Sequence, residues 1–418
     1  MGPPTRRLIE LMPPSSPESA AATGLPAFDG TLPPPRVVVI ETTRHCNLKC
    51  PTCLQFLAGT TVSGPHMKID LFRKVAAEVF PHVDVFQPTV SGEPFMSKGF
   101  VEMVETAKQW GVRLDITTNG TFLDERRRAL VLPVLSALWL SIDGATRETF
   151  EKLRLGAKFD KVMGYMRALR DEVAELPREE RPLIGFSPVL TRDNVHELPT
   201  MVELAHELRA DRVVASHVHA DENDTYSKEV CLVWSQDLAT EWIGRAAARA
   251  EALCMPLFIG PLDAHVARAA GAENVDGNAL PAWSIHQDRV PPPPVVRPTE
   301  AAAQTRGAEG SWVPPPAAEV VAAAAPATSV WGCRYLWERP HIALDGAVTP
   351  CCVPGAPVLG NLTEERFQDV WNGEEFVRMR VGLVKKDPTD FCRGCQHIVE
   401  VEDPGLIAGY LQGRGLPV

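Results

Sequence analysis

The sequence has no apolar run of the ~20 residues that a membrane-spanning helix requires, and its first residues, Met1 to Met12, lack the apolar centre of a secretory signal. Its 42 lysines and arginines are not clustered, and 53 acidic residues outnumber them, for a net charge of -11. Neutralising the phosphates of a nucleic acid needs clustered basic side chains. The sequence therefore predicts a cytoplasmic protein that binds neither a membrane nor a nucleic acid.

Length and composition predict two folded domains. A chain of 418 residues with 45% hydrophobic residues can bury one large α/β core and a smaller one. The Pro-, Ser- and Ala-rich composition of residues 1–35 predicts a disordered tail. We expect a Pro- and Ala-rich linker or insertion at 263–330 and a second tail at 401–418. The folded domains are therefore expected at 36–262 and 331–400.

In the larger domain, β-branched or apolar runs alternate with amphipathic stretches. This alternation is typical of βα units around a parallel sheet. The six predicted strands are Val37 to Glu41, Val85 to Val90, Arg113 to Thr117, Ala137 to Ile142, Leu183 to Val189 and Arg212 to His219.

Three of the ten cysteines follow the first predicted strand closely. Cys46, Cys50 and Cys53 are separated by three and two residues. Three thiolates on one loop can hold three irons of a cubane iron–sulfur cluster and leave the fourth iron open to another ligand. A structural zinc site needs four ligands, so the local count of three favours a 4Fe-4S cluster.

This CxxxCxxC spacing resembles the signature of the radical S-adenosylmethionine (radical SAM) superfamily, although Thr52 stands where the family has an aromatic residue. The resemblance implies a partial (βα)6 barrel with its active site at the carboxyl ends of the strands. It also implies that SAM binds the open iron and is reductively cleaved to a 5'-deoxyadenosyl radical. In such a site the cofactors supply the chemistry, and the protein positions them.

Two turns resemble SAM-binding turns of the family. The run Ser91-Gly92-Glu93-Pro94 follows the second predicted strand. In it Gly92 allows close backbone approach, and Glu93 can accept a hydrogen bond from the SAM amino group. Asn119 lies in a Thr-Asn-Gly turn after the third strand and is expected near the SAM ribose or carboxylate; the alternative is a simple Asn-Gly turn.

The fourth predicted strand leads into Ser141-Ile142-Asp143-Gly144, with Arg154 after the next helix. This block resembles one found in radical SAM enzymes that carry C-terminal clusters. The resemblance implies that Ser141 contacts a polar group of SAM and that Arg154 pairs with the SAM carboxylate. Asp143 either contacts the ligand or caps the helix that follows.

The smaller domain repeats the cysteine pattern. An Asp-Gly pair within His341 to Val348 predicts a hairpin, and a helix spanning Phe367 to Met379 precedes a CxxC pair. This order resembles the twitch domain, the shortened form of the SPASM domain, and implies one auxiliary 4Fe-4S cluster. Its expected ligands are Cys333, Cys351, Cys392 and Cys395, with structural zinc as the alternative. Cys352 can replace Cys351, although the spacing from Gly346 favours Cys351.

Oxidation of an alcohol by this chemistry requires a base in the barrel mouth. His217 and His219 alternate at the end of the sixth predicted strand, so both imidazoles point to one side, and they are the candidates. Tyr226 and Trp234 are expected to line the pocket.

The favoured function is that of a radical SAM oxidoreductase. It would dehydrogenate or epimerise a small polar metabolite, such as a sugar or aminocyclitol, with the auxiliary cluster relaying electrons and ferredoxin or flavodoxin supplying them. One alternative is a maturase that oxidises or cross-links a ribosomally made peptide. Such enzymes often carry an N-terminal winged-helix domain, and residues 1–35 are too short and Pro-rich for one. The other alternative, a non-catalytic iron–sulfur or zinc carrier, would not need the SAM-binding turns.

Overall fold

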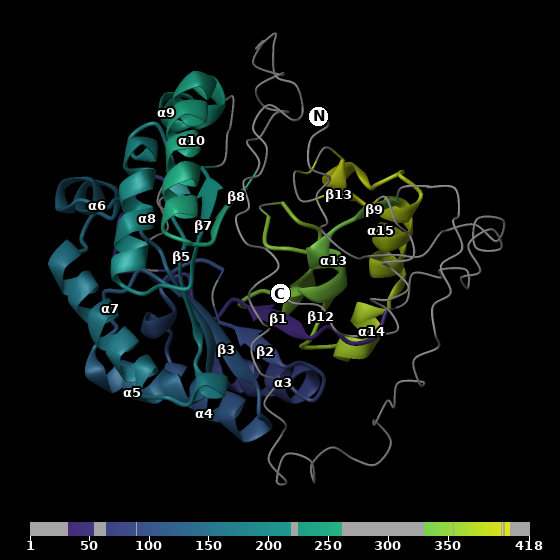
Figure 1. Cartoon of the computed structure of the whole chain (residues 1–418). Coiled ribbons are helices and arrows are strands. Elements are labelled where there is room, and N and C mark those ends of the chain that lie inside the picture. Colours follow the sequence, from purple (N-terminus) through teal and green to yellow (C-terminus); the bar gives the residue numbers. More distant parts are fainter. Residues whose placement is uncertain are drawn as a thin grey trace, which may run out of the picture.

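The computed structural model describes residues 32–53, 64–88, 90–218, 225–260, 330–353, 355–393, 395 and 398–401. Its main sheet has the strand order β12-β11-β10-β1-β2-β3-β4-β5-β7-β6, and β8 also pairs with β7 (Figure 1). The strands of the larger domain are β1 (Val37–Ile40), β2 (Val85–Gln87), β3 (Arg113–Thr118), β4 (Leu135–Leu140), β5 (Leu183–Phe186), β6 (Val189–Leu190), β7 (Arg212–His217) and β8 (Leu257–Ile259). All pairings among them are parallel. The predicted α/β fold class is confirmed.

Helices connect these strands in the predicted alternation. They are α3 (Ile69–Val79), α4 (Phe100–Trp110), α5 (Glu125–Val131), α6 (Arg147–Leu153), α7 (Phe159–Ala174), α8 (Leu198–Glu207), α9 (Thr225–Val230) and α10 (Gln236–Ala252). Each of the longer ones buries one apolar stripe; in α3 the buried residues are Phe72, Val75, Ala76 and Val79. None of the described helices combines the length and the apolar composition of a membrane span.

The strands match the six predicted runs apart from their ends. The fifth run was predicted to continue to Val189, but β5 ends at Phe186, and the short β6 begins after Pro188. Proline has no N–H to donate to a strand ladder, so the pairing breaks there. The sixth strand ends at His217, whereas the prediction extended to His219.

Alternate residues of the strands face opposite sides of the sheet. Phe86 of β2 packs its ring against Phe72 and Phe80, which identifies the helix-covered side. Gln87 and Asp115, neighbours in the extended β2–β3 register, lie on the opposite, interior side, as does Trp139 of β4. A Cβ on Gly185 would lie 2.5 Å from the Trp139 ring, so the missing side chain leaves room for this indole. The interior side therefore carries polar and aromatic groups.

The C-terminal residues form β9 (Val330–Gly332), α13 (Arg334–Glu338), β10 (His341–Ile342), β11 (Ala347–Thr349), β12 (Gly360–Asn361), α14 (Phe367–Trp371), α15 (Glu374–Val384) and β13 (Val399–Val401). The expected hairpin is β10–β11, with Gly346 at φ +87 in its turn. The single helix expected over Phe367 to Met379 is instead two helices, broken at Asn372 and Gly373.

This C-terminal unit extends the sheet of the larger domain. Strand β10 pairs in parallel with β1, Val39 opposite His341 and Ile40 opposite Ile342. Figure 1 shows the unit, coloured green to yellow, beside β1 and on the side of the sheet away from α5 to α8. The strand before the first cysteine loop is thus shared by both halves of the molecule.

Residues just before β1 lie against α14. The Asn372 side chain accepts from the Leu32 N–H at 2.9 Å and donates to the Leu32 carbonyl at 3.0 Å, while the Trp371 indole donates to the Pro33 carbonyl at 2.9 Å. Leu32 and Pro33, which the sequence assigns to a disordered tail, are therefore held on the C-terminal unit.

Candidate active site

The loop after β1 carries Cys46, Cys50 and Cys53, all with free thiols. A turn closes its end, with the Cys53 N–H donating to the Cys50 carbonyl at 3.0 Å. Burial, together with the charges of Glu93, Cys50 and Cys53, raises the pKa of Cys46 to about 11. Binding a metal requires loss of these protons.

The turn containing Gly92 packs its backbone against the start of this loop. The Glu93 N–H donates to the His45 carbonyl at 2.8 Å, and Gly92 has φ +74. A Cβ on Gly92 would lie 2.7 Å from the His45 carbonyl oxygen and 2.8 Å from that of Thr43. The predicted close approach of backbone at Gly92 is thus an approach to the cysteine loop.

We expect Gly92→Ala to lower the free energy of unfolding by about 1–3 kcal/mol, because alanine adds both backbone strain and a clash, and to reduce the iron bound at the first cysteine set. The control is Gly164→Ala in α7, where an added Cβ meets nothing within 4 Å. That change should stabilise the helix by about 0.5–1 kcal/mol. Denaturation and iron analysis of both variants check this; stability changes of the same sign would contradict it.

Glu93 is 1% exposed. Its carboxylate accepts from the Thr118 hydroxyl at 2.7 Å and from the Asn119 N–H at 2.9 Å. Burial raises the pKa of Glu93 to about 7, against the lowering effect of these donors. A cationic amino group beside it would favour the ionised form, which suits the role predicted for Glu93.

The Asn119 side chain is turned toward the cysteine loop. Its Nδ2 donates to Asn47 Oδ1 at 3.0 Å and lies 3.8 Å from Cys46 Sγ. Its Oδ1 accepts from the N–H and hydroxyl of Thr121 at 2.9 and 2.7 Å. In this structure Asn119 therefore joins the end of β3 to the cluster loop through Asn47 and Thr121, two partners that sequence reasoning missed.

Asp143 forms a buried ion pair with Arg154, a contact that neither alternative for Asp143 anticipated. Arg154 Nε lies 2.6 Å from Asp143 Oδ2, with the two side chains 13% and 3% exposed. The other Asp143 oxygen accepts from the Val189 N–H at 2.8 Å. The helix cap expected of Asp143 is supplied by Thr146 instead. Asp143 is thus a positioning residue for Arg154, whose Nη1 lies 4.0 Å from Cys50 Sγ.

Ser91 donates to the carboxylate of Glu41, the residue directly after β1. The same carboxylate accepts from Arg44 Nε and Nη2 at 3.0 and 2.9 Å. Glu41 therefore ties the Ser91 turn to the start of the cysteine loop. Sequence reasoning missed this role, which could have been inferred only from the position of Glu41 as a single acidic residue directly after an apolar strand. Pro94 begins a short 3-10 helix, and the Ser141 N–H donates to the Thr118 carbonyl at 2.9 Å, joining β4 to β3.

The C-terminal cysteines gather at one end of the antiparallel pair β9–β13. Cys333 directly follows β9, and Cys395 precedes β13, whose Val399 lies opposite Gly332. The Cys395 N–H donates to the Cys392 carbonyl at 3.1 Å. Burial, together with the charges of Cys395 and Cys392, raises the pKa of Cys333 to about 12.

Of the two adjacent cysteines, Cys351 is buried and Cys352 is exposed. Burial, together with the charges of Cys333, Cys352 and Cys395, raises the pKa of Cys351 to about 12. The charges acting on Cys352 are instead those of Arg339 and Glu41. Its burial and these neighbours favour Cys351, which stays the predicted ligand.

His217 lies on the same strand parity as the buried Val213 and Ala215, and its Nε2 is 3.1 Å from the Gly260 carbonyl. Burial lowers the pKa of His217 to about 4, which makes it a weak base near neutral pH. These observations favour a structural role. His219 lies outside the described residues.

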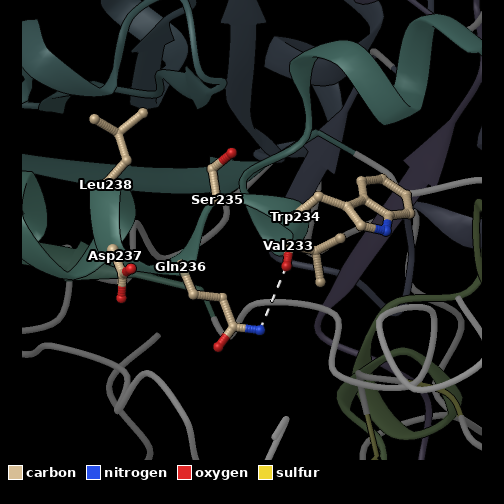
Figure 2. Close-up of a pocket in the computed structure, with 6 residues that line it drawn as sticks. All are labelled: Val233, Trp234, Ser235, Gln236, Asp237 and Leu238. Carbon is tan, nitrogen blue, oxygen red and sulfur yellow. Dashed lines mark hydrogen bonds between the residues drawn. The ribbon is translucent and has the colours of Figure 1, made fainter. Parts of the chain in front are cut away.

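A pocket of about 490 Å³ is lined by the described residues Val233 to Leu238, between the 3-10 helix Leu232–Trp234 and α10. Figure 2 shows the Trp234 ring turned away from Asp237 and Leu238, and the Gln236 side chain donating to the Val233 carbonyl at 3.4 Å. Trp234 thus lines a pocket, as expected, and no cysteine is among the described residues that line it. Tyr226 lies on α9.

The two cysteine sets fit iron–sulfur clusters by donor type and count. Three thiols leave one cubane iron open, and four complete a second cluster. In the described part of the chain no three His, Cys, Asp or Glu side chains are arranged to hold a single metal ion; in a cubane each cysteine binds a different iron.

The fold and the cysteine sets together define an α/β protein that can hold iron–sulfur clusters. A model of the radical SAM superfamily matches residues 40–205, and a model of the SPASM iron–sulfur cluster-binding domain matches residues 333–396. The chain belongs to the radical SAM superfamily and carries a C-terminal SPASM domain. Its cofactors are SAM, a SAM-binding 4Fe-4S cluster and an auxiliary iron–sulfur cluster, as predicted.

Among curated proteins, the chain is 30% identical over 188 residues to the PqqA peptide cyclase of Bradyrhizobium diazoefficiens (44% of this chain, 47% of that protein). It is also 30% identical over 190 residues to the Fe-coproporphyrin III synthase of Methanosarcina barkeri (44% of each chain). Each match spans about half of the relative or less. The fold resembles that of Streptococcus suis SuiB bound to its precursor peptide SuiA, with a TM-score of 0.53 at 14% identity, over 93% of this chain and 73% of that one.

These relatives contradict the preference for a sugar or aminocyclitol as substrate. The cyclase is named for a peptide, and SuiB is solved with one. The argument from residues 1–35 was wrong because it tied peptide binding to one kind of N-terminal domain.

Proposed function

We propose that this chain is a radical SAM maturase that oxidises or cross-links a ribosomally made peptide. The observation that carries the proposal is the shared strand β1: the cysteine loop follows it directly, and β10, which leads into the Cys351 hairpin, pairs with it. In this proposal, the SAM-cleaving site and the electron-accepting site would lie beside neighbouring strands of one sheet. The peptide cyclase relative and the SuiB-like fold support a peptide as the substrate.

When bound, SAM and its cluster would supply the chemistry for removing a hydrogen atom from the substrate, and an auxiliary cluster would supply an acceptor for the electron released afterwards. The proposed role of this chain is to position them. Glu93 holds the SAM amino group, and Arg154, oriented by Asp143, pairs with the SAM carboxylate. A low-potential donor such as ferredoxin or flavodoxin, in the cytoplasm, would supply the initiating electron.

The test uses synthetic peptides corresponding to short open reading frames beside the gene. Reduced, reconstituted enzyme is incubated with SAM and each peptide, and 5'-deoxyadenosine and peptide mass are measured together. We expect one peptide to lose two hydrogens per 5'-deoxyadenosine formed, since one leaves as an atom and one as a proton after oxidation. The variant with Cys46, Cys50 and Cys53 replaced by Ala is the blank. Enzyme that cleaves SAM but leaves every peptide unchanged would contradict the proposal.

A further inference from the structure

The interior side of the sheet holds a buried acid and a buried base that contact each other only loosely. Asp115 of β3 is 8% exposed. Its Oδ2 accepts from Gln87 Nε2 at 2.6 Å and lies 3.6 Å from Arg339 Nη2. Arg339 comes from the segment between α13 and β10, so the two domains each contribute one partner.

Each partner also keeps one buried polar atom without a hydrogen bond. Among the described residues, Asp115 Oδ1 has no donor in good hydrogen-bonding geometry and Arg339 Nε has no acceptor. The Trp139 side chain, on the same side of the sheet, is a further neighbour of the Asp115 carboxylate. Leaving such atoms unsatisfied costs free energy. Asp115 Oδ2 and Arg339 Nη2 are 3.6 Å apart. The free acceptor, Oδ1, and the free donor, Nε, belong to the same two side chains and therefore lie in the same small volume.

A ligand for this volume must donate to Asp115 and accept from Arg339, and must be neutral overall, because one charge of each sign is already present. A primary carboxamide carries an N–H and a carbonyl oxygen on the same edge. A trans backbone peptide points these groups in opposite directions. A carboxylate offers no donor, and Asp115 repels it.

We propose that Asp115 and Arg339 form a subsite for a primary carboxamide, the side chain of an Asn or Gln residue in the substrate peptide. The peptide as its source rests on the proposed function; the carboxamide chemistry does not. Arg339 lies between α13, which directly follows Cys333, and β10, so the subsite would hold the substrate on the side of the C-terminal unit. Gln87 is a positioning residue, because its donation to Oδ2 leaves Oδ1 free for the ligand.

Crystals of the reconstituted enzyme soaked with acetamide test the location, and NMR titration with acetamide, N-methylacetamide and acetate tests the selectivity. We expect acetamide between Asp115 Oδ1 and Arg339 Nε, bound at least ~10-fold more tightly than N-methylacetamide, whose N–H points away from its carbonyl. Water alone at the site, or equal affinity for the two amides, would overturn the proposal.

The variant Asp115→Asn gives the sharpest check. Gln87 Nε2 will orient the new amide so that its oxygen takes the place of Oδ2, which puts an NH2 group where Oδ1 was. The subsite then offers two donors, so the preference should reverse from acetamide to acetate. Arg339→Lys, which removes Nε, should weaken acetamide binding at least ~10-fold, while the exposed control Arg378→Lys should not change it. Unchanged acetamide binding in Asp115→Asn would mean an adventitious additive only.

The outcome is separable from that of the proposed function. If acetamide binds with the predicted reversal but no peptide is modified, the carboxamide subsite is supported and the peptide as its ligand is contradicted. With a peptide that is turned over, replacing its Asn or Gln by Asp or Glu should raise KM at least ~10-fold with little change in kcat; an unchanged KM would sink the subsite alone.

Discussion

Replacing Cys46 with alanine is expected to abolish the formation of 5'-deoxyadenosine from SAM while leaving the C-terminal cluster in place. The variant should retain about four of about eight irons per chain, because Cys333, Cys351, Cys392 and Cys395 lie on other elements. Iron and sulfide analysis with EPR of the reduced enzyme, with and without SAM, checks this. The signal that shifts on adding SAM should be the one that disappears.

Two further cysteine variants complete this experiment. Cys392→Ala should remove the other half of the iron and keep the SAM-dependent shift. Cys254→Ser, at an exposed thiol after α10, should change neither iron content nor activity. Cleavage of SAM at the wild-type rate by Cys46→Ala would contradict the assignment of the first cluster.

Replacing Asp143 with asparagine is expected to produce the second large effect. The buried ion pair loses its negative partner, so Arg154 is left as an uncompensated charge, at a cost of about 3–5 kcal/mol in unfolding free energy. SAM affinity should fall about 10- to 100-fold, because Arg154 is no longer held beside the cluster loop. Chemical denaturation and titration of the SAM-dependent EPR change measure the two effects.

The matched control is Asp160→Asn, which breaks the ion pair between Asp160 and Arg147. Both of these side chains are 66% exposed, so the loss should be below about 1 kcal/mol with no change in SAM affinity. If the two variants were equally stable and bound SAM equally well, Asp143 would not be positioning Arg154.

The larger domain was predictable because its signals are local. Runs such as Val37 to Ile40 are apolar and β-branched, so the strands fall within a few residues of their predicted places. The errors have local causes as well: Pro188 ends a strand, and Asn372 with Gly373 breaks a helix. The cysteine sets were found because their spacing is itself the signal.

Side-chain partners were less predictable, because they depend on long-range contacts. Asn119 and Asp143 stand in turns that resemble SAM-binding turns, but their partners, Asn47 and Arg154, are brought to them by the fold. Arg339 and Asp115 are more than two hundred residues apart in the sequence, and no sequence motif predicts that they lie close together. The substrate preference failed because no residue pattern in this chain reports a substrate directly.

The pairing of β10 with β1 has a consequence for synthesis on the ribosome. β1 is complete at Ile40, but the partner for one of its edges emerges only with His341 and Ile342. At about 5–20 residues per second, that edge and the adjacent cysteine loop wait about 15–60 s without the strand that covers them. An open strand edge invites pairing with other chains. The nascent protein thus passes through a long interval in which helper proteins have access to both the edge and the thiols.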